Sequence, residues 1–355
     1  MPKWNVSTAL IPSKSVVDTD DEKVHYWKSL MEAWCIHGKR ATSDTFFPGC
    51  HPRSMSRSNL ASLASHPYSV TYKSDGIRYI LYLTMRLNSS PPAAVALMIN
   101  RSRQMYEVEV VAPEDYFVKG SIFEGELVWV QPDEKCMSYL VFDAIMVKGE
   151  PFLSKPFHER MAAAAECTRW SQEVCSLEEG VEGRAAELDA VIMTQFEPRI
   201  LMQPKCFVDV CNASDLWKKR TQAGHRVDGL VLMRKNAPYM IGTASDQCYK
   251  WKVDVTIDLK GTNATAADGP LPSNICGREV TFSTQSRIVP EHEDDIIEYL
   301  VRLQGEGSLE LFAMRRRIDK STPNGLCVVD ATVRDLIEAM DVDELSKASP
   351  AMSKT

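Results

Sequence analysis

The most informative stretch of the sequence is Lys73-Ser74-Asp75-Gly76-Ile77-Arg78, a K-x-D-G-x-R array. It lies between two segments, 68–72 and 78–86, that are rich in β-branched and aromatic residues and predict strands. Asp75 and Gly76 are typical turn residues, so the array taken alone also fits a charged hairpin turn. Features elsewhere along the chain must decide between a turn and a chemical site.

The residue types in this array suit a lysine nucleophile. A lysine attacks only when its amine is neutral, and a nearby cationic environment would lower the pKa of Lys73 toward that state. We expect Asp75 to orient the lysine and Gly76 to let the backbone approach a ligand closely. Arg78 carries the planar guanidinium that holds a phosphate or a ribose hydroxyl.

Four more strand-like segments with charged residues follow in order: Phe123-Glu124-Gly125-Glu126-Leu127-Val128, Tyr139-Leu140-Val141-Phe142-Asp143-Ala144, Val227-Asp228-Gly229-Leu230-Val231 and Tyr249-Lys250-Trp251-Lys252. Carboxylates at strand ends suit ribose hydroxyls and a divalent ion. Lys250 and Lys252 are two residues apart, so both point to one face of a strand, where both can meet one triphosphate. Each segment alone fits a strand with solvated ends, but chance explains five in this order poorly.

The composition is that of an ordinary globular protein and excludes several classes. The chain has 355 residues and a net charge of -7, so any contact with nucleic acid must come from a local basic groove. Its ten cysteines form no C-x-x-C pair, which argues against a zinc ribbon. No signal peptide and no apolar run long enough for a bilayer are found, so we expect no membrane association and reduced thiols in an intracellular setting.

The order of the five motifs resembles the covalent nucleotidyltransferase superfamily, which comprises ATP-dependent DNA ligases, RNA ligases and mRNA capping enzymes. The resemblance runs from about residue 48 to residue 340. Three features favour capping enzymes: the segment 48–57, the strand Leu97-Met98-Ile99-Asn100-Arg101, and the segment 314–324. The last is similar to the R-x-D-K-x-x-P-N element of their mobile second domain, and ligases end differently. Asn100 replaces the usual acid, which weakens the match at its neighbour Arg101.

The resemblance implies an α+β fold with two domains. We expect a nucleotidyltransferase domain of ATP-grasp-like antiparallel sheets at 1–255, an OB-fold lid domain at 256–330, and a C-terminal helix and tail at 331–355. Hydrophobic patterns predict further strands at 95–99, 106–111, 122–130, 139–145, 227–233, 279–282 and 309–314. They predict helices at 24–34, 158–177, 294–303 and 331–340, with a polar linker or loop at 261–272.

The activity implied by the resemblance is that of an mRNA guanylyltransferase, a transferase of mRNA processing. In that family the lysine attacks the α-phosphate of GTP and forms a covalent lysyl-N-GMP with release of pyrophosphate. The GMP then passes to the 5′-diphosphate end of RNA and forms the GpppN cap. The catalytic residues carried over are Lys73, Asp228, Lys250 and Lys252. The residues carried over as GTP-binding are Arg78, Arg101, Glu126, Phe142, Lys205, Asp258, Arg317, Asp319 and Lys320.

The resemblance also implies roles within this set. Arg78 and Glu126 would hold the ribose, and Lys205 would read the guanine O6 because a lysine donates and cannot accept. Phe142 would stack on the base. The residues of the second domain would place cations on the β- and γ-phosphates when that domain closes. Asp258 arrives about two residues earlier than the family pattern has its acid, so it is the weaker match.

Further expectations concern the metal, the partners and the location. Mg²⁺ or Mn²⁺ is expected because phosphoryl transfer spreads negative charge over several oxygens, although the sequence assigns no metal ligand. The length leaves no room for both a triphosphatase and a methyltransferase domain, so we expect separate proteins for these activities, and RNA polymerase is another candidate partner. The family implies a nuclear location; a viral enzyme would work in the host cytoplasm.

Two alternative functions stay open at this point. One is an ATP-dependent RNA or DNA ligase of the same superfamily, and the other is a non-catalytic subunit of a capping complex. Several residues are expected to be structural: His51, His66 and His158 are assigned to the core or surface. Trp251 is expected in the core, pointing opposite to the lysines beside it.

Overall fold

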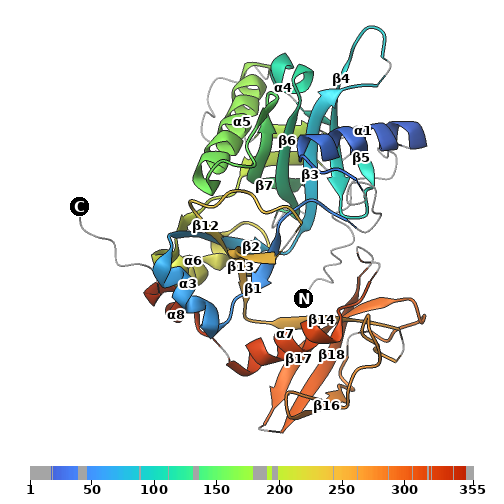
Figure 1. Cartoon of the computed structure of the whole chain (residues 1–355), viewed down its shortest axis with the longest axis vertical. Helices are drawn as coiled ribbons and strands as arrows, with labels where there is room; N and C mark the ends of the chain where they lie inside the picture. Colours follow the sequence, from blue (N-terminus) through green and yellow to red (C-terminus); the bar gives the residue numbers. More distant parts are fainter. Residues whose placement is uncertain are drawn as a thin grey trace.

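Three β-sheets form the framework of the computed structural model, and helices cover their outer faces (Figure 1). The structure describes residues 17, 19–38, 46–87, 89–110, 112–130, 136–178, 190–193, 199–242, 244–261, 263–286, 288–305, 307–317, 320, 322–338 and 340–348. One sheet has eight strands and the other two have five each. Most neighbouring strands are antiparallel, which confirms the expected mixed fold with antiparallel sheets.

The eight-stranded sheet contains β3 (Ile77–Met85), β4 (Ala94–Asn100), β5 (Met105–Val110), β6 (Ser121–Trp129), β7 (Cys136–Val147), β8 (Glu150–Pro151), β9 (Ala190–Met193) and β10 (Arg199–Pro204). Strand β10 pairs with β9 and also runs parallel to β7, so the sheet curls back on itself. Successive residues of a strand face opposite sides. Tyr79 and Leu81 are therefore buried on one side of β3, and Ile80 and Tyr82 on the other.

Helices cover both faces of this sheet (Figure 1). Helices α4 (Glu114–Val118) and α5 (Phe157–Glu178) pack on the face that Tyr79 and Leu81 occupy. Helix α1 (Asp20–Ala33) packs on the opposite face through Tyr26 and Leu30. Because both faces are buried, the strands read as nearly continuous apolar runs in the sequence.

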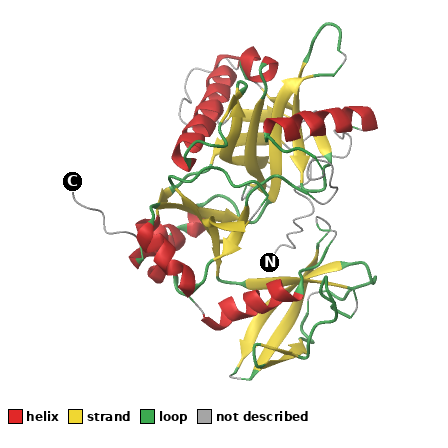
Figure 2. Ribbon diagram, viewed as in Figure 1, coloured by secondary structure: helices red, strands yellow, loops and turns green. Residues whose placement is uncertain are grey.

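The first five-stranded sheet contains β1 (His51–Ser54), β2 (Tyr68–Ser74), β11 (Val208–Asp209), β12 (Val227–Arg234) and β13 (Ala244–Lys252). One of its faces joins the core under the eight-stranded sheet through Val231, Met233 and Cys248. The other face, with Tyr249 and Trp251, packs on three short helices: α3 (Leu60–Ser65), α6 (Ala213–Lys218) and α8 (Val342–Lys347). Figure 2 shows these helices gathered on one side of the sheet.

The chain passes from one sheet to the other at the K-x-D-G-x-R array. Strands β2 and β3 flank the array but belong to different sheets and do not pair, so the array is not a hairpin. A Cβ atom on Gly76 would lie 2.4 Å from the carbonyl oxygen of Leu127 in β6. The close approach of the β6 backbone therefore requires glycine here. Gly76 also lines the cavity, and the close approach of a ligand that we expected stays a prediction.

The second five-stranded sheet contains β14 (Val255–Lys260), β15 (Asn274–Ile275), β16 (Arg278–Phe282), β17 (Ile296–Gln304) and β18 (Ser308–Arg316). Strand β17 shows that the helix expected at 294–303 is wrong. Its β-branched and aromatic residues favour a strand, and six consecutive residues from Ile296 are buried between β14 and β18. A five-stranded sheet is compatible with the expected OB-fold, which stays a prediction.

The C-terminal part of the chain returns to the first five-stranded sheet. Helix α7 (Leu326–Glu338) packs on β14 and β17 through Val329 and Val333. The chain then crosses back, so that Leu345 of α8 is buried against the other sheet. The indole nitrogen of Trp251 donates to the carbonyl of Met340 at 3.0 Å. Helix α7 runs across residue 330, and the predicted domain limits at 255 and 330 stay predictions.

Most other predicted elements are present with shifted ends. The helices expected at 24–34, 158–177 and 331–340 correspond to α1, α5 and α7. The expected strands correspond to β2 to β7, β12, β16 and β18. The cysteines whose side chains the structure describes are free thiols: Cys35, Cys50, Cys167, Cys206, Cys211, Cys248, Cys276 and Cys327. Within the described residues, no helix combines the length and apolar character that crossing a membrane requires.

Candidate active site

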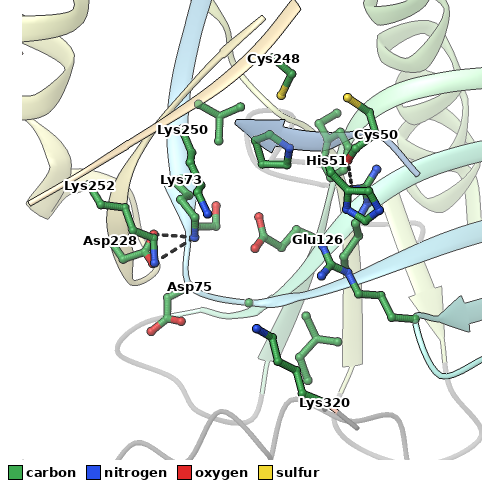
Figure 3. A pocket seen from close by; sticks show the side chains of 18 of the residues that line it. Cys50, His51, Lys73, Asp75, Glu126, Asp228, Cys248, Lys250, Lys252 and Lys320 are labelled. Atoms are coloured by element: carbon green, nitrogen blue, oxygen red, sulfur yellow. Dashed lines mark hydrogen bonds and ion pairs between the residues drawn. The ribbon is translucent and has the colours of Figure 1, made fainter. Parts of the chain in front are cut away.

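A cavity of about 540 Å³ lies where the three sheets meet, a size typical of a small-ligand site (Figure 3). All twelve of the described residues that the sequence singled out line it: Lys73, Arg78, Arg101, Glu126, Phe142, Lys205, Asp228, Lys250, Lys252, Asp258, Arg317 and Lys320. The thirteenth, Asp319, lies outside the described residues. The tertiary structure therefore brings together residues that are up to 247 positions apart in the sequence.

The floor of the cavity is formed by the lysine row, which we define as Lys73, Lys250 and Lys252 with Asp228. Strand register builds it, because Gly229 of β12 pairs with Lys73 of β2 on one side and with Lys252 of β13 on the other. The Nζ atom of Lys73 donates to both carboxylate oxygens of Asp228, at 2.9 and 3.0 Å. The Nζ atom of Lys252 lies 2.8 Å from the same carboxylate.

Lys73 carries a raised pKa, which contradicts our expectation of a lowered one. Burial alone would lower the pKa of its amine, but the attraction of Asp228 and Glu126 outweighs this effect. The same pairing holds the pKa of Asp228 below its ordinary value, because Lys73 and Lys252 outweigh the opposing effect of burial. The Lys73 amine is therefore protonated at neutral pH, and a lysine acts as a nucleophile only after it loses this proton.

Lys250 shows the environment that we expected at Lys73. Burial, followed by repulsion from Lys252 and Lys73, lowers the pKa of Lys250 to about 8. The side chain of Trp251 between the two lysines points into the core, 5.1 Å from the ring of Trp217, as predicted. The lysine row thus contains three lysines and one carboxylate, Asp228, so it carries excess positive charge.

Arg78 is held by protein groups on the eight-stranded sheet. Its guanidinium lies 2.6 Å from a carboxylate oxygen of Glu124 and donates to the carbonyl of Cys50 at 2.5 Å. It also lies 5.2 Å from the centroid of the Phe142 ring. The hydroxyl of Tyr239 donates to the second oxygen of Glu124 at 2.5 Å. This network fixes Arg78 and Phe142 at the cavity wall.

Glu126 and Lys205 form the neighbouring pair on the same wall. The Nζ atom of Lys205 lies 3.1 Å from a carboxylate oxygen of Glu126 and 5.9 Å from the centroid of the Phe142 ring. An aromatic face, an ammonium and a carboxylate thus converge, and this combination suits the base and ribose of a nucleotide. The individual roles of Glu126, Lys205 and Phe142 stay predictions.

The third side of the cavity is the arginine cluster, which we define as Asp258, Glu298, Arg315, Arg317 and Lys320 of the second five-stranded sheet and its C-terminal extension. Arg317 lies 3.2 Å from Asp258, and Lys320 pairs with the same carboxylate. Arg315 lies 2.5 Å from Glu298. Burial would raise the pKa of Glu298, but Arg315 and Arg317 outweigh it and lower that pKa. Two carboxylates therefore offset three cations here.

Asp75 does not orient Lys73, contrary to our expectation. Its carboxylate lies 3.0 Å from Arg226 and 3.6 Å from Arg315, and Asp228 holds the lysine in its place. Because Arg315 belongs to β18, this contact joins the array to the second five-stranded sheet. Figure 3 shows Asp75 set apart from the carboxylate of Asp228.

Several cavity residues were missed by the sequence reasoning. Glu124 lies two positions from the predicted Glu126 in β6, and Arg315 lies two positions from the predicted Arg317. Because residues two positions apart in a strand share a face, this spacing was the signal that could have found Glu124 and Arg315. His51, which we assigned to the core or surface, is only partly buried and lines the cavity. Burial and the cations Arg101, Arg78 and Lys250 lower the pKa of His51 to about 4, so its imidazole is neutral.

The described residues offer no group of three or more His, Cys, Asp and Glu side chains placed to hold a metal ion. The carboxylates of Asp228 and Glu126 nevertheless face the cavity. Mg²⁺ is commonly bound by one or two carboxylates together with phosphate oxygens of the substrate, rather than by an all-protein cage. This donor set fits a hard divalent cation that arrives with a nucleotide.

Comparison with known protein families decides the relationship. Residues 10–254 match the family described as "mRNA capping enzyme, catalytic domain". The chain belongs to the mRNA capping enzyme family. The match includes the lysine row and the residues of the eight-stranded sheet that line the cavity, whereas the arginine cluster lies beyond it.

Similar proteins include other members of the capping enzyme family. The chain is 24% identical over 348 residues to an mRNA-capping enzyme of Caenorhabditis elegans, covering 90% of this chain and 50% of that protein. It is 28% identical over 237 residues to "mRNA-capping enzyme subunit alpha" of Neurospora crassa, covering 60% and 53%. The chain thus spans about half the length of these curated relatives.

Among solved structures, this capping enzyme family member is similar to one titled "mycobacterial DNA ligase D complexed with ATP and MES". The TM-score is 0.42 at 12% identity, over 78% of this chain and 97% of the other. This likeness is too loose to add to the assignment, which rests on the family match.

Proposed function

We propose that this protein is an mRNA guanylyltransferase that works through a covalent lysyl-N-GMP. The observation that carries the proposal is the Lys73 amine, held 2.9 Å from Asp228 at the floor of a cation-lined cavity. Support comes from the match to the capping enzyme catalytic domain, which spans residues 10–254 and so includes Lys73.

In the first step the nitrogen of Lys73 attacks the α-phosphorus of GTP. A P–N bond forms, the P–O bond to the β-phosphate breaks, and pyrophosphate leaves with the electron pair. The attacking amine must give up its proton, and Asp228 is the acceptor in contact with it. Because the pKa of Lys73 is raised and that of Asp228 is lowered, this transfer is uphill in the empty site.

Lys250 and Lys252 stabilise the reacting phosphate. They extend from β13 beside Lys73, and their positive charge opposes the negative charge that accumulates on the phosphoryl oxygens. The side chains of Lys73 and Lys252 are only 21% and 23% exposed, so this interaction is stronger than it would be in water. The arginine cluster faces the same space and supplies cations to the β- and γ-phosphates, with Asp319 as a further member that stays a prediction.

In the second step the terminal oxygen of a 5′-diphosphate RNA attacks the phosphorus of the lysyl-GMP. A new P–O bond forms, the P–N bond breaks, and the lysine nitrogen takes up a proton as it leaves. The product is the GpppN end. The choice of guanine rests on Lys205, whose ammonium donates to a guanine O6 and finds no equivalent acceptor on adenine.

Mg²⁺ or Mn²⁺ is part of the proposal. Asp228 and Glu126 would hold the ion together with phosphate oxygens, and it would supply charge neutralisation on those oxygens. The protein residues bind and orient the nucleotide around it. Removal of the divalent ion with a chelator should therefore weaken the binding of GTP to the protein without changing the position of Lys73.

The wider setting is proposed from the relatives. One relative is named as a subunit of an mRNA-capping enzyme, which supports separate partners such as an RNA triphosphatase, a methyltransferase or RNA polymerase. A nuclear location, with the host cytoplasm as the alternative for a viral protein, follows from the proposed activity. An OB-fold for the second five-stranded sheet belongs to the same proposal.

The test is covalent labelling of the purified protein with GTP or ATP that carries ³²P in the α-position. The expected result is an acid-labile label from GTP with Mg²⁺ that is absent with ATP and absent in Lys73→Ala. A label from ATP would make the protein a polynucleotide ligase instead. If neither nucleotide labels it, the catalytic proposal is wrong and a non-catalytic subunit of a capping complex becomes the better description.

A further inference from the structure

Two thiols in the cavity wall take no part in the chemistry described above. Cys50 and Cys248 both line the cavity, although only 8% and 5% of their surfaces are exposed (Figure 3). Among the cysteines whose side chains the structure describes, no other lines it. The fold thus brings two thiols that are 198 positions apart in the sequence to the wall of one small-molecule cavity.

The pairing of β1 with β13 builds this thiol pair. Residues 48–55 run alongside residues 242–250, and main-chain hydrogen bonds of 2.9 and 2.8 Å join the two segments at their ends. Cys50 and Cys248 lie between these two hydrogen bonds, one on each segment. The thiol of Cys248 donates a hydrogen bond to the sulfur of Cys50. The two sulfur atoms are therefore direct neighbours.

The surroundings of Cys50 favour its thiolate form. The hydrogen bond from Cys248 lowers the pKa of Cys50 against the opposing effect of burial, and the charge of Arg78 adds to the lowering. Cys248 keeps its proton, because the same hydrogen bond and burial raise its pKa. Cys167 of α5 is the contrast, since burial raises the pKa of that thiol to about 12. A cysteine close to an arginine, with a second thiol beside it, has the setting of a redox-reactive cysteine and its resolving partner.

We propose that Cys50 and Cys248 are a site of reversible oxidation, at which a hydroperoxide that enters the cavity joins them in a disulfide. With hydrogen peroxide, the thiolate of Cys50 attacks one oxygen, an S–O bond forms, the O–O bond breaks, and the hydroxide that leaves takes up a proton. The sulfur of Cys248 then attacks the sulfenic acid of Cys50. The S–S bond forms, the S–O bond breaks, and the departing hydroxide takes the proton of Cys248. Two thiols lose two electrons, and the peroxide is reduced to two water molecules.

The disulfide would disturb the part of the wall that holds Arg78. The carbonyl of Cys50 accepts from Arg78 at 2.5 Å, and the N–H of Cys50 donates to the hydroxyl oxygen of Tyr239 at 2.8 Å. Tyr239 in turn donates to Glu124, the carboxylate that pairs with Arg78. Joining the sulfur atoms draws the two chain segments together, so these main-chain contacts shift and Arg78 loses its position. This consequence rests on the proposed function, under which the oxidised protein binds GTP less well.

The first experiment locates the bond without using activity. The whole chain is treated with hydrogen peroxide, the remaining thiols are blocked with N-ethylmaleimide, and peptides from a digest without reductant are analysed by mass spectrometry. We expect a cross-linked pair of peptides that carry Cys50 and Cys248 and that separate in dithiothreitol. In Cys248→Ser the sulfenic acid of Cys50 has no resolving thiol, so dimedone should label Cys50 in that variant but not in the unchanged protein.

The second experiment measures self-labelling with GTP before and after peroxide, each protein relative to its own reduced form. Labelling of the unchanged protein should fall by about tenfold or more and return with dithiothreitol, because a small displacement of a positioning group costs a large part of the rate. Cys50→Ser should resist peroxide, since it lacks the attacking thiolate. Cys327→Ser is the matched control, because Cys327 is an exposed cysteine of α7 that does not line the cavity, and it should respond like the unchanged protein.

Other results would overturn the inference. If Cys50 and Cys248 are recovered as separate blocked thiols after peroxide has oxidised the exposed Cys327, the pair is a packing contact only. Peroxide-sensitive labelling that persists in Cys50→Ser would assign the effect to another cysteine, and full labelling of the cross-linked protein would remove the effect on Arg78. If the unchanged protein fails to label at all, the proposed function fails, and the cross-linked peptides still decide whether the disulfide forms.

Discussion

The lysine row and the arginine cluster face each other across one cavity but differ in their charge balance. In the lysine row, one carboxylate, Asp228, contacts both Lys73 and Lys252, and burial with lysine repulsion lowers the pKa of Lys250 to about 8. In the arginine cluster, Asp258 and Glu298 each hold cations, and the pKa of Glu298 is lowered. The first site carries excess positive charge, whereas the second is nearly compensated.

This difference assigns different tasks to the two sites. Under the proposed function, the excess positive charge of the lysine row suits the binding of phosphates next to the nucleophile throughout the reaction. Compensated charge on the arginine cluster suits a site that holds no permanent anion, because each partly exposed cation already has a carboxylate partner. Under the proposed function, phosphates would compete with Asp258 and Glu298 for these cations, so contacts made by the arginine cluster would be easier to break after the reaction.

The largest effect is expected for Lys73→Ala, which removes the nucleophile from the lysine row. Covalent labelling with GTP should fall to background, because neither Lys250 nor Lys252 replaces the attacking nitrogen at its position on β2. Lys28→Ala on the exposed face of α1 is the matched control. Residual labelling in Lys73→Ala would show that the lysine row contains a second nucleophile, with the lowered pKa of Lys250 making it the first to test.

Asp228→Asn should lower labelling at neutral pH by about 10²-fold, because the amine of Lys73 loses the group that orients it. The pKa of Lys73 is raised by this carboxylate, so removal of the charge lowers that pKa. The labelling rate, which rises as Lys73 loses its proton, should then rise at lower pH than in the unchanged protein. The measurement is the pH dependence of single-turnover labelling, and an unshifted profile would contradict this role for Asp228.

Asp258→Asn converts the compensated site into one with excess positive charge. Arg317 and Lys320 then lose the attraction of Asp258, while Arg317 keeps Glu298 at 3.9 Å, and both can bind phosphate oxygens more strongly. We expect the KM for GTP to fall by up to about tenfold and pyrophosphate to become a stronger inhibitor. Steady-state labelling with added pyrophosphate measures both, and a higher KM would show that Asp258 serves the nucleotide directly.

Lys250→Arg should give the smallest effect and only at high pH. With a pKa of about 8, Lys250 is charged below that pH and neutral above it, so the KM for GTP should rise as the pH passes through 8. An arginine stays protonated, so the KM of the variant for GTP should not rise with pH. Above pH 8 the variant should therefore bind GTP about threefold to fivefold more tightly than the unchanged protein. Identical pH dependence of KM in the two proteins would remove Lys250 from phosphate binding.

The order of the motifs and the family resemblance carried most of the cavity residues, and period two carried those of β13. Alternation placed Lys250 and Lys252 on one face with Trp251 on the other, and the structure confirms this arrangement. The same rule, applied to β6 and β18, would have added Glu124 and Arg315 to the site. The helix expected at 294–303 was wrong because consecutive buried residues, several of them β-branched or aromatic, favoured the strand β17.

The sequence by itself indicated which residues line the cavity, because residue type and order are local properties that alternation and motif spacing preserve. Only the tertiary structure decided their partners. Lys73 contacts Asp228, 155 positions away, rather than Asp75, two positions away, because β2 pairs with β12 while the array crosses to another sheet. The pKa of each lysine depends on such long-range pairing, since charge interactions fall with distance in space and not with distance along the chain.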